Sequence, residues 1–393
     1  MRLLELLVVS LKLGLTSFGG PVAHIGYFRD EYVVRRKWLD EHTYADLVAL
    51  CQFLPGPASS QVGIAVGITR GGILGGIAAW VGFTLPSAVA LIFFGYGVTE
   101  YDELVTGDWL RGLKIVAVAV VALAVWGMAK TLTPDRSRAT IAVLAAIAML
   151  FSQNALGQVA VIVVAGLVGW RLLGDQTGLT GLTGGRIKIG RWLAIGSLAA
   201  FFVLLVGLPL ARQVVASDWL DVFDGFYRSG ALMFGGGHVV LPLLQTEVVA
   251  PGWVTNDQFI AGYGAAQAVP GPLFTFSAYL GTVMDGSPGG WTGGFFALGA
   301  IFLPSFLLVV GVLPFWNSLR SVASFRAALM GVNAAVVGLL IAALYDPVWT
   351  SAIQTPKDFA LCVAAFGLLA FWKWPPWLVV LLAAAAGAGL SKL

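Results

Sequence analysis

Charged residues are scarce in this 393-residue sequence, and cysteine and histidine are scarcer still. Asp, Glu, Lys and Arg make up 11% of the chain, whereas hydrophobic residues make up 58% and the mean hydropathy is +0.87. This composition excludes a chain of soluble domains, because too few polar side chains remain to cover their surfaces. The sequence therefore predicts an all-α polytopic membrane protein that lies in the lipid bilayer.

Several kinds of chemistry are excluded by what is missing. The two cysteines, Cys51 and Cys362, lie in apolar runs, which argues against disulfides and thiolate metal sites. The chain has no His-Glu-x-x-His, no Gly-x-Ser-x-Gly and no Walker A motif, so we expect no enzyme activity, metal or cofactor. A net charge of +3 is too small to indicate nucleic acid as a partner.

The chain contains an internal repeat. Ser17-Phe18-Gly19-Gly20 matches Met233-Phe234-Gly235-Gly236, which lies 216 positions later. The segment from Gln52 to Pro57 matches the segment from Gln267 to Pro272, each ending in Pro-Gly-Pro. Other features also recur in the same order, namely Leu85-Pro86-Ser87 with Leu303-Pro304-Ser305, Lys12 with Arg228, Glu31 with Glu247, Trp38 with Trp253, and Arg111 with Arg326. The sequence thus predicts a first repeat (1–173) and a second repeat (219–393), joined by a loop and linker transmembrane helix (174–218).

Each repeat begins with short segments and continues with four longer apolar runs. The longer runs are 71–98, 109–129, 139–152 and 156–173 in the first repeat, 291–316, 325–345, 358–372 and 376–391 in the second, and 192–216 in the linker. A helix needs about 20 residues to span the hydrocarbon, and the arms beside each Pro-Gly-Pro have only about 10 to 13. They predict either a re-entrant hairpin that lines a cavity or a single broken helix.

The basic residues favour hairpins and opposite orientations of the two repeats. Arg29, Arg35, Arg36 and Lys37 form the densest basic loop, which is therefore expected in the cytoplasm. A hairpin after this loop keeps the seven basic residues between Lys130 and Arg191 on the same side. The counterpart of the loop in the second repeat, 241–257, has no Lys or Arg, which indicates inverted topology. Arg212 and Lys357 do not fit this pattern.

Inverted repeats with interrupted helices are typical of secondary transporters, whose site lies near the bilayer midplane. Helices that start at Gly and Pro breaks present unpaired N–H groups, which favour an anion. Lys12 and Arg228 are costly cations in apolar helices, so we expect both at one shared pocket. The predicted substrate-binding residues are Lys12, Ser17, Gly19, Gly20, Gln52, Gly56, Ser59, Ser60, Arg228, Gly235, Gly236, Gln267, Gly271, Thr275 and Ser277.

A second group of residues is predicted to couple or gate transport. Its members are His24, Glu31, Arg111, His238, Glu247 and Arg326. Structural roles are alternatives for all of them: packing for the histidines, interfacial anchoring for the arginines, and pairing with Arg29 or Arg35 for Glu31. Lys12 has a similar alternative, because its ammonium group could reach the cytoplasmic interface.

The segments around the breaks resemble the bacterial chromate ion transporter family. The resemblance rests on Phe18-Gly19-Gly20-Pro21-Val22-Ala23-His24, on Tyr44 to Gln61, and in the second half on Phe234 to His238 and Gln267 to Pro272. It implies a permease of the inner membrane that exports chromate with the proton motive force and confers chromate resistance. Sulfate or another oxyanion is the alternative substrate, and an anion channel is the alternative mechanism. Whether the chain forms a homodimer stays open.

Overall fold

The computed structural model describes residues 2–18, 20–100, 109–151, 155–174, 189–233, 240–286, 288–316 and 322–390, and every regular element in these ranges is a helix. The helices are α1 (Arg2–Thr16), α2 (Gly20–Arg29) with a π-helical extension (Asp30–Arg35), α3 (Glu41–Phe53), α4 (Ala58–Glu100), α6 (Trp109–Leu132), α7 (Arg136–Phe151), α8 (Ala155–Leu172), α9 (Arg191–Ala211), α10 (Asp218–Ala231), α11 (Val240–Val248), α12 (Asn256–Ala268), α13 (Phe276–Val283), α14 (Gly290–Val312), α16 (Ala323–Ala343), α17 (Thr350–Ala352), α18 (Pro356–Ala370) and α19 (Pro376–Leu390).

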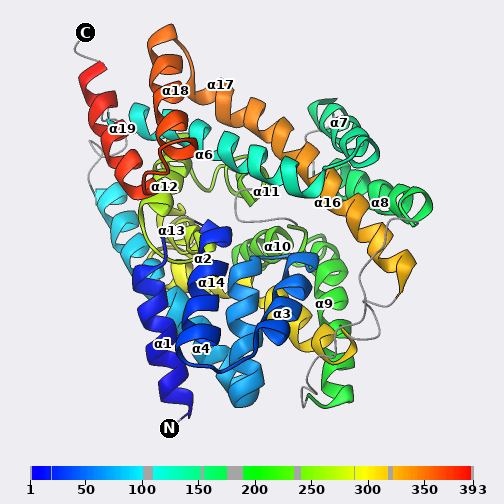
Figure 1. Ribbon diagram of the computed structural model, residues 1–393. Helices are drawn as coiled ribbons and strands as arrows, with labels where there is room; N and C mark the ends of the chain where they lie inside the picture. The colour runs from blue at the N-terminus through cyan, green and yellow to red at the C-terminus, as the bar shows by residue number, and fades with distance from the viewer. Residues whose placement is uncertain are drawn as a thin grey trace.

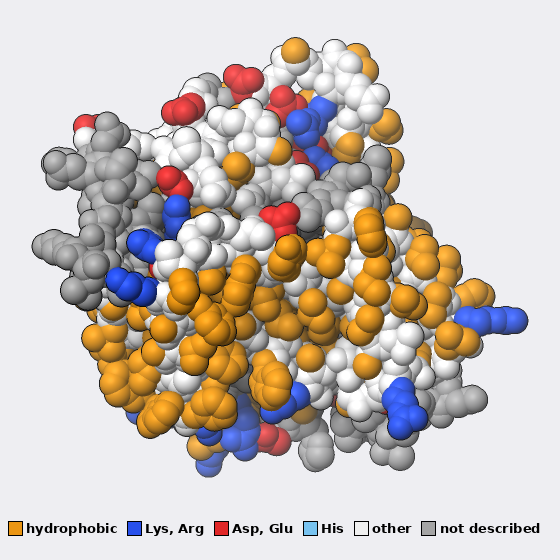
Figure 2. Space-filling view, turned by 90° about the horizontal axis from the view of Figure 1, so that it is seen from above, with side chains coloured by type: hydrophobic (Ala, Val, Ile, Leu, Met, Phe, Trp, Pro, Cys, Tyr) orange, Lys and Arg blue, Asp and Glu red, His pale blue; other side chains and the backbone are white. Residues whose placement is uncertain are grey.

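Hydrophobic side chains cover a broad area of the surface. Figure 2 shows them gathered over the middle and lower part of that face, with charged side chains in separate groups above and below. Within the described ranges, α4, α6, α9, α14 and α16 are long and apolar enough to cross a membrane. The protein buries 72% of the apolar window of α14 but only 22% of that of α9, so the linker helix α9 lies at the rim. This surface suits a polytopic membrane protein.

The predicted apolar runs all coincide with helices, and the linker run is α9. The last two helices of each repeat, α7 and α8 in the first and α18 and α19 in the second, have only 15 to 18 residues. They are therefore shorter than the span of about 20 residues that a straight crossing requires. Several helix starts are capped by side chains, among them Asp40 before α3 and Thr255 before α12, which satisfy N–H groups of the first turn.

The segment around each Pro-Gly-Pro folds as a hairpin, as the charge pattern predicts. In the first repeat, the guanidinium carbon of Arg70 lies 4.1 Å from the ring centre of Trp38, which precedes α3. In the second, the amide of Asp285 donates to the carbonyl of Trp253, which precedes α12, at 3.1 Å. The chain thus returns to the end from which each hairpin began, so the alternative of a single broken helix is wrong for both repeats.

The first hairpin leads directly into a long helix through a sharp turn within α4. Gly72 has φ +64°, a conformation that favours glycine, and it separates the arm 58–71 from the arm 73–100. The two arms pack so closely that a Cβ on Gly67 would lie 2.3 Å from the carbonyl oxygen of Gly75. Gly281 and Gly293 make the same approach between α13 and α14. Small residues at these crossings allow the backbones to touch.

The two repeats exchange their last helices. The α7 and α8 helices of the first repeat pack against α16 of the second, whereas α18 and α19 of the second repeat pack against α6 of the first (Figure 1). At these crossings a Cβ on Gly331 of α16 would lie 2.1 Å from the carbonyl oxygen of Ala165 in α8. A Cβ on Gly112 of α6 would come still closer to the carbonyl oxygen of Ala383 in α19. The halves are therefore intertwined.

Candidate functional site

The Pro-Gly-Pro tip of each repeat is bound to the helix break of the other repeat. The amide of Gly56, in the first tip (Pro55–Pro57), donates to the carbonyl of Met233 at 2.6 Å. The amide of Gly271, in the second tip (Pro270–Pro272), donates to the carbonyl of Ser17 at 2.9 Å. Since Ser17 and Met233 are equivalent in the repeat, the two bonds are related by exchange of the halves. The interrupted segments therefore meet between the repeats, as the architecture predicts.

The two tip glycines cannot be replaced without strain. Gly56 has φ +119° and Gly271 has φ +96°, both in the region that favours glycine. A Cβ at Gly56 would lie 2.6 Å from Oγ of Ser305, and one at Gly271 would lie 2.6 Å from Oγ of Ser87. Ser87 and Ser305 mark the repeat in the sequence, but their position beside the opposite tip is visible only in the structure.

Polar side chains gather beside the first tip. His24 of α2 lies with Nδ1 3.3 Å from Oγ of Ser59, and both side chains are buried. In the first turn of α4, Oγ of Ser60 and Oε1 of Gln61 are buried and have no hydrogen-bond partner among the described residues. The same is true of Oγ of Ser17, whose carbonyl accepts from the second tip. A buried polar group without a partner costs about 1–3 kcal/mol. Several such atoms next to the start of α4 therefore indicate a place for a hydrogen-bonding ligand.

The second tip is chemically different. The hydroxyls of Thr275 and Ser277 donate to the carbonyls of Pro272 and Phe274 in their own turn, both at 2.8 Å. Gln267 keeps one buried nitrogen, Nε2, for which the described residues offer no partner. At the equivalent positions 60 and 275, the first tip thus carries an unsatisfied hydroxyl and the second tip a satisfied one.

The recurring charged residues form equivalent ion pairs within each repeat. Nζ of Lys12 lies 3.3 Å from Oε2 of Glu31, and Nη2 of Arg228 lies 2.8 Å from Oε2 of Glu247. Each pair connects the first helix of a repeat to the helical segment after its break. The sequence predicts Lys12 and Arg228 in one shared pocket. That arrangement stays a prediction, since both cations contact carboxylates of their own repeat.

Glu31 is surrounded by cations. Besides Lys12, it accepts hydrogen bonds from Arg35 at 3.3 Å and Arg36 at 2.8 Å. The predicted partner Arg35 is thus correct, whereas Arg29 binds Glu41 instead. Burial opposes ionisation of Glu31, but the hydrogen bonds from Arg36, Lys12 and Arg35 outweigh it and hold the pKa of this carboxyl below its ordinary value. Glu31 is therefore ionised throughout the physiological range.

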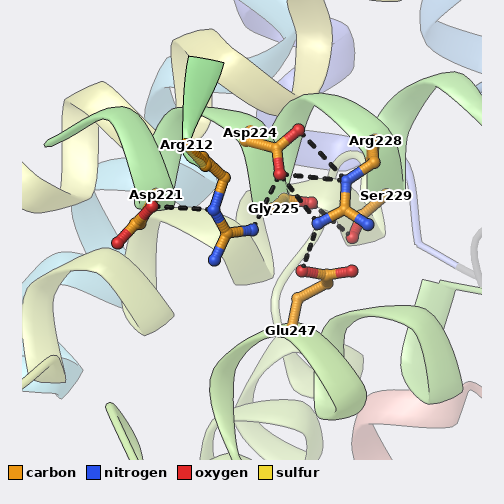
Figure 3. Close-up of polar contacts among 7 residues, drawn as sticks. All are labelled: Arg212, Asp221, Asp224, Gly225, Arg228, Ser229 and Glu247. Atoms are coloured by element: carbon orange, nitrogen blue, oxygen red, sulfur yellow. Dashed lines mark hydrogen bonds and ion pairs between the residues drawn. The ribbon is translucent and has the colours of Figure 1, made fainter. Parts of the chain in front are cut away.

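Glu247 belongs to a network with more acidic than basic groups (Figure 3). Arg228 binds Glu247 and Asp224 together, and Asp224 also accepts from Nη1 of Arg212 at 2.7 Å. Nε of Arg212 binds Asp221 at 2.7 Å. Three carboxylates thus share two guanidinium groups. Burial raises the pKa of Glu247 above its ordinary value, with Arg228 opposing and Asp224 reinforcing this shift.

The family of this protein follows from its sequence similarity to known proteins. The family model described as chromate transporter matches the chain twice, over residues 4–170 and 220–388. The chain belongs to the chromate transporter family. Each of the two matches falls within one predicted repeat. The segment that the family model describes is therefore the repeat whose break and tip bind those of the other repeat.

Relatives from three bacteria align with nearly the whole chain. A chromate transport protein from Pseudomonas aeruginosa is 30% identical over 395 residues, covering 96% of this chain and 90% of the relative. A chromate transport protein from Cupriavidus metallidurans is 26% identical, covering 99% and 92%. A probable chromate transport protein from Synechococcus elongatus is also 26% identical, covering 96% and 93%. No solved structure shows a significant match to the chain.

Arg111 of this chromate transporter family member joins the two halves. Its guanidinium binds Asp358 of α18 through two hydrogen bonds, of 2.8 and 3.0 Å, and Asp358 is fully buried. Asp358 also forms the capping box of α18 with Thr355. The equivalent Arg326 has a buried Nε that finds no partner in the described part of the chain. Arg111 therefore has a clear structural contact, which the sequence alternatives did not include.

The other predicted residues have varied positions. Gly20 has φ +78° and begins α2, whereas Gln52 is exposed on α3. Gly19, Gly235, Gly236 and His238 lie outside the described residues.

Five residues contact the site or its ion pairs although they were not predicted from the sequence. They are Gln61, Ser87, Ser305, Asp224 and Arg212. Arg212 carried a signal, because it breaks the charge pattern. No cluster of side chains that could hold a metal ion occurs among the described residues.

Proposed function

We propose that this chain is a secondary transporter that exports chromate across the plasma membrane by alternating access, using the proton motive force, and thereby confers chromate resistance. The proposal extends the family membership and the substrate named for the relatives to this chain. The single observation that supports it best is the reciprocal binding of each tip to the opposite break. A site between two such repeats can be opened first to one side and then to the other.

The unsatisfied polar atoms at the start of α4 and at Ser17 suit a tetrahedral oxyanion. The hydroxyls of Ser17 and Ser60 can donate to it, and the start of α4 supplies backbone N–H groups and a partial positive charge. His24 lies within reach of Ser59 and can donate from either ring nitrogen, depending on its tautomer. The predicted donors of the second repeat, Thr275 and Ser277, and the cations Lys12 and Arg228 would act during the part of the cycle in which the halves rearrange.

Export is the electrically downhill direction for a dianion. An inside-negative potential favours its exit by about 4.6 kcal/mol per 100 mV, which is twice the value for one charge. The coupling ion that we propose is the proton, and its candidate carriers are His24, His238, Glu31 and Glu247. A homodimer is compatible with this mechanism but is not required by it.

Purified protein in proteoliposomes tests this function. We expect saturable chromate flux that is accelerated by chromate on the opposite side of the membrane, and accumulation of chromate in everted vesicles of expressing cells. Flux no greater than in protein-free liposomes would reject chromate transport. Flux that neither saturates nor shows exchange would indicate a channel, and stronger competition by sulfate than by chromate itself would make sulfate the substrate.

Substitution of the two repeat-related cations tests the site. With normal expression, Lys12→Ala and Arg228→Ala are expected to abolish anion flux, because each removes a charge that we place near the oxyanion during transport. Lys114→Ala is a suitable control, since Lys114 pairs with the half-exposed Asp257 and neither residue is among the predicted site residues. Normal flux in both Lys12→Ala and Arg228→Ala would exclude them from the site.

A further inference from the structure

The two repeat-related ion pairs differ in how many cations surround the carboxylate. Glu31 is contacted by Lys12, Arg35 and Arg36, all within 3.3 Å. In the second repeat, the positions four and five residues after Glu247 are Pro251 and Gly252, which cannot replace these arginines. Glu247 therefore has Arg228 as its cation among the described residues.

The cation that remains is shared with another acid. Asp224 accepts from Nε of Arg228 with both carboxylate oxygens at 3.1 Å, and Nη2 of Arg228 lies 2.8 Å from Asp224. With the 216-residue offset, the position of Asp224 corresponds to Val8 in the first repeat, so a carboxylate at this position occurs in the second repeat alone. In the first repeat Glu5 competes for Arg36, but Lys12 and Arg35 still contact Glu31. Asp224 is fully buried and held by both arginines. It is therefore the more firmly held of the two carboxylates that Arg228 binds.

Glu247 is the less firmly held carboxylate. One of its oxygens, Oε2, contacts Arg228, whereas Oε1 has no hydrogen bond to the described residues. The side chain is 11% exposed, so a proton can reach it. It approaches α10 at Gly225, where a Cβ would lie 3.3 Å from Oε2. The charged groups around it are Arg212 at the end of α9 and Asp221, Asp224 and Arg228 of α10, while α14, which packs on α10, carries no charged residue.

We propose that Glu247 is the proton-binding residue that couples transport to the proton gradient, and that the equivalent Glu31 is not. This inference rests on the proposed function and selects one carrier from its four candidates. A proton on Glu247 removes the excess negative charge of the network and weakens the contact between α10 and α11, which lie on either side of the second break. The proton motive force can then favour one conformation of the second repeat, while the first repeat keeps its ion pair.

Transport with and without a proton gradient tests this assignment. In everted vesicles, an imposed gradient with acid on the extracytoplasmic side should accelerate chromate export by the wild type several-fold. Glu247→Gln should lose this acceleration but keep chromate exchange, which needs no net proton movement. Glu247→Asp, which retains a carboxyl, should recover part of the acceleration, and the matched control Glu31→Gln should keep it. Acceleration of Glu247→Gln equal to that of the wild type would overturn the assignment.

A measurement without chromate separates this inference from the proposed function. Purified protein is shifted from about pH 8 to about pH 5.5, a range in which an ordinary Glu binds little proton, and uptake is followed with a pH indicator. Glu247→Gln should take up fewer protons than the wild type, and Glu31→Gln the same number as the wild type. Equal uptake by Glu247→Gln and the wild type would contradict the inference even if chromate transport is found. Absence of chromate flux together with the expected proton difference would reject the transport function alone.

Discussion

The backbone amide of Gly56 in one half of the protein donates a 2.6 Å hydrogen bond to the carbonyl of Met233 in the other half. The bond from Gly271 to Ser17 is its counterpart under the repeat. Neither half can move its tip without affecting the break of the other half. Both tips are therefore expected to change together during transport.

Replacement of the tip glycines should impair both stability and transport. In Gly56→Ala and Gly271→Ala, the positive φ costs about 1–2 kcal/mol, and the new methyl group clashes with a serine of the opposite repeat. We expect a lower thermal unfolding midpoint in detergent and at least a tenfold loss of flux. Gly20→Ala introduces a side chain at positive φ but no clash, and Gly26→Ala introduces neither. The losses of stability and flux should therefore be largest for the tip glycines, smaller for Gly20→Ala and smallest for Gly26→Ala. Equal stability of all four variants would contradict the described tip geometry.

Substitutions at the two tips should affect chromate binding differently. Ser60→Ala removes a buried hydroxyl that we assign to the oxyanion, and a hydrogen bond to a charged group contributes about 1.5–3 kcal/mol. The KM for chromate should therefore rise at least about tenfold. Thr275→Ala removes a hydroxyl that is bonded within its own turn and should therefore raise the KM less than Ser60→Ala does. Initial rates in proteoliposomes measure both, and a larger effect of Thr275→Ala would place the substrate at the second tip.

The ion pair between Arg111 and Asp358 should stabilise the contact between the halves. Asp358→Asn leaves the arginine without its charged partner and weakens the capping box of α18, so we expect a loss of about 2–3 kcal/mol. Asp257→Asn breaks another pair between the repeats, with Lys114, but that carboxylate is half exposed and its loss should cost at most about 1 kcal/mol. Chemical unfolding in detergent measures both variants. Equal losses would show that burial of Asp358 does not strengthen its pair.

The stability of the protein should respond in opposite ways to acid through Glu31 and Glu247. The pKa of Glu31 lies below the ordinary value of 4.5, so its contribution is present above that pH and is lost as the pH falls through the folded-state pKa. The pKa of Glu247 lies above 4.5, so the wild type gains stability relative to Glu247→Gln as the pH falls through that pKa. Unfolding midpoints of Glu31→Gln and Glu247→Gln against pH, each relative to the wild type, should therefore diverge. Parallel curves for the two variants would contradict the different electrostatic environments of Glu31 and Glu247.

Much of the fold follows from the sequence, because its signals are local. The lengths of the apolar runs predict the helices, and the positions of Arg70 and Lys130 predict hairpins through the distribution of charge. The pairing of Lys12 with Glu31 was missed because Arg35, one helical turn after Glu31, is the nearer cation in the chain. The exchange of α7 and α8 onto α16 also left no local signal, since any apolar helix face can pack on another.

The candidate site was predicted in part. Gly56, Gly271 and the serines after the first tip were selected from the motif, whereas Ser87 and Ser305 reach the tips only through contacts between the repeats. Asp224 and Arg212 were missed because neither has a counterpart in the first repeat, and the search for recurring residues cannot find groups that occur once. Their contact explains why Arg212 departs from the charge pattern, since two aspartates neutralise it.

The exchanged helices also bear on how the chain is made. When α7 and α8 leave the ribosome, their partner α16 has not yet been synthesised, because residues 173–322 lie between the end of α8 and the start of α16. The first half must therefore wait in the bilayer with an unfinished surface, and its completion depends on the arrival of the second half. A ribosome that stalls before residue 323 would release a chain that cannot mature, and such a chain would be a natural substrate for membrane quality control.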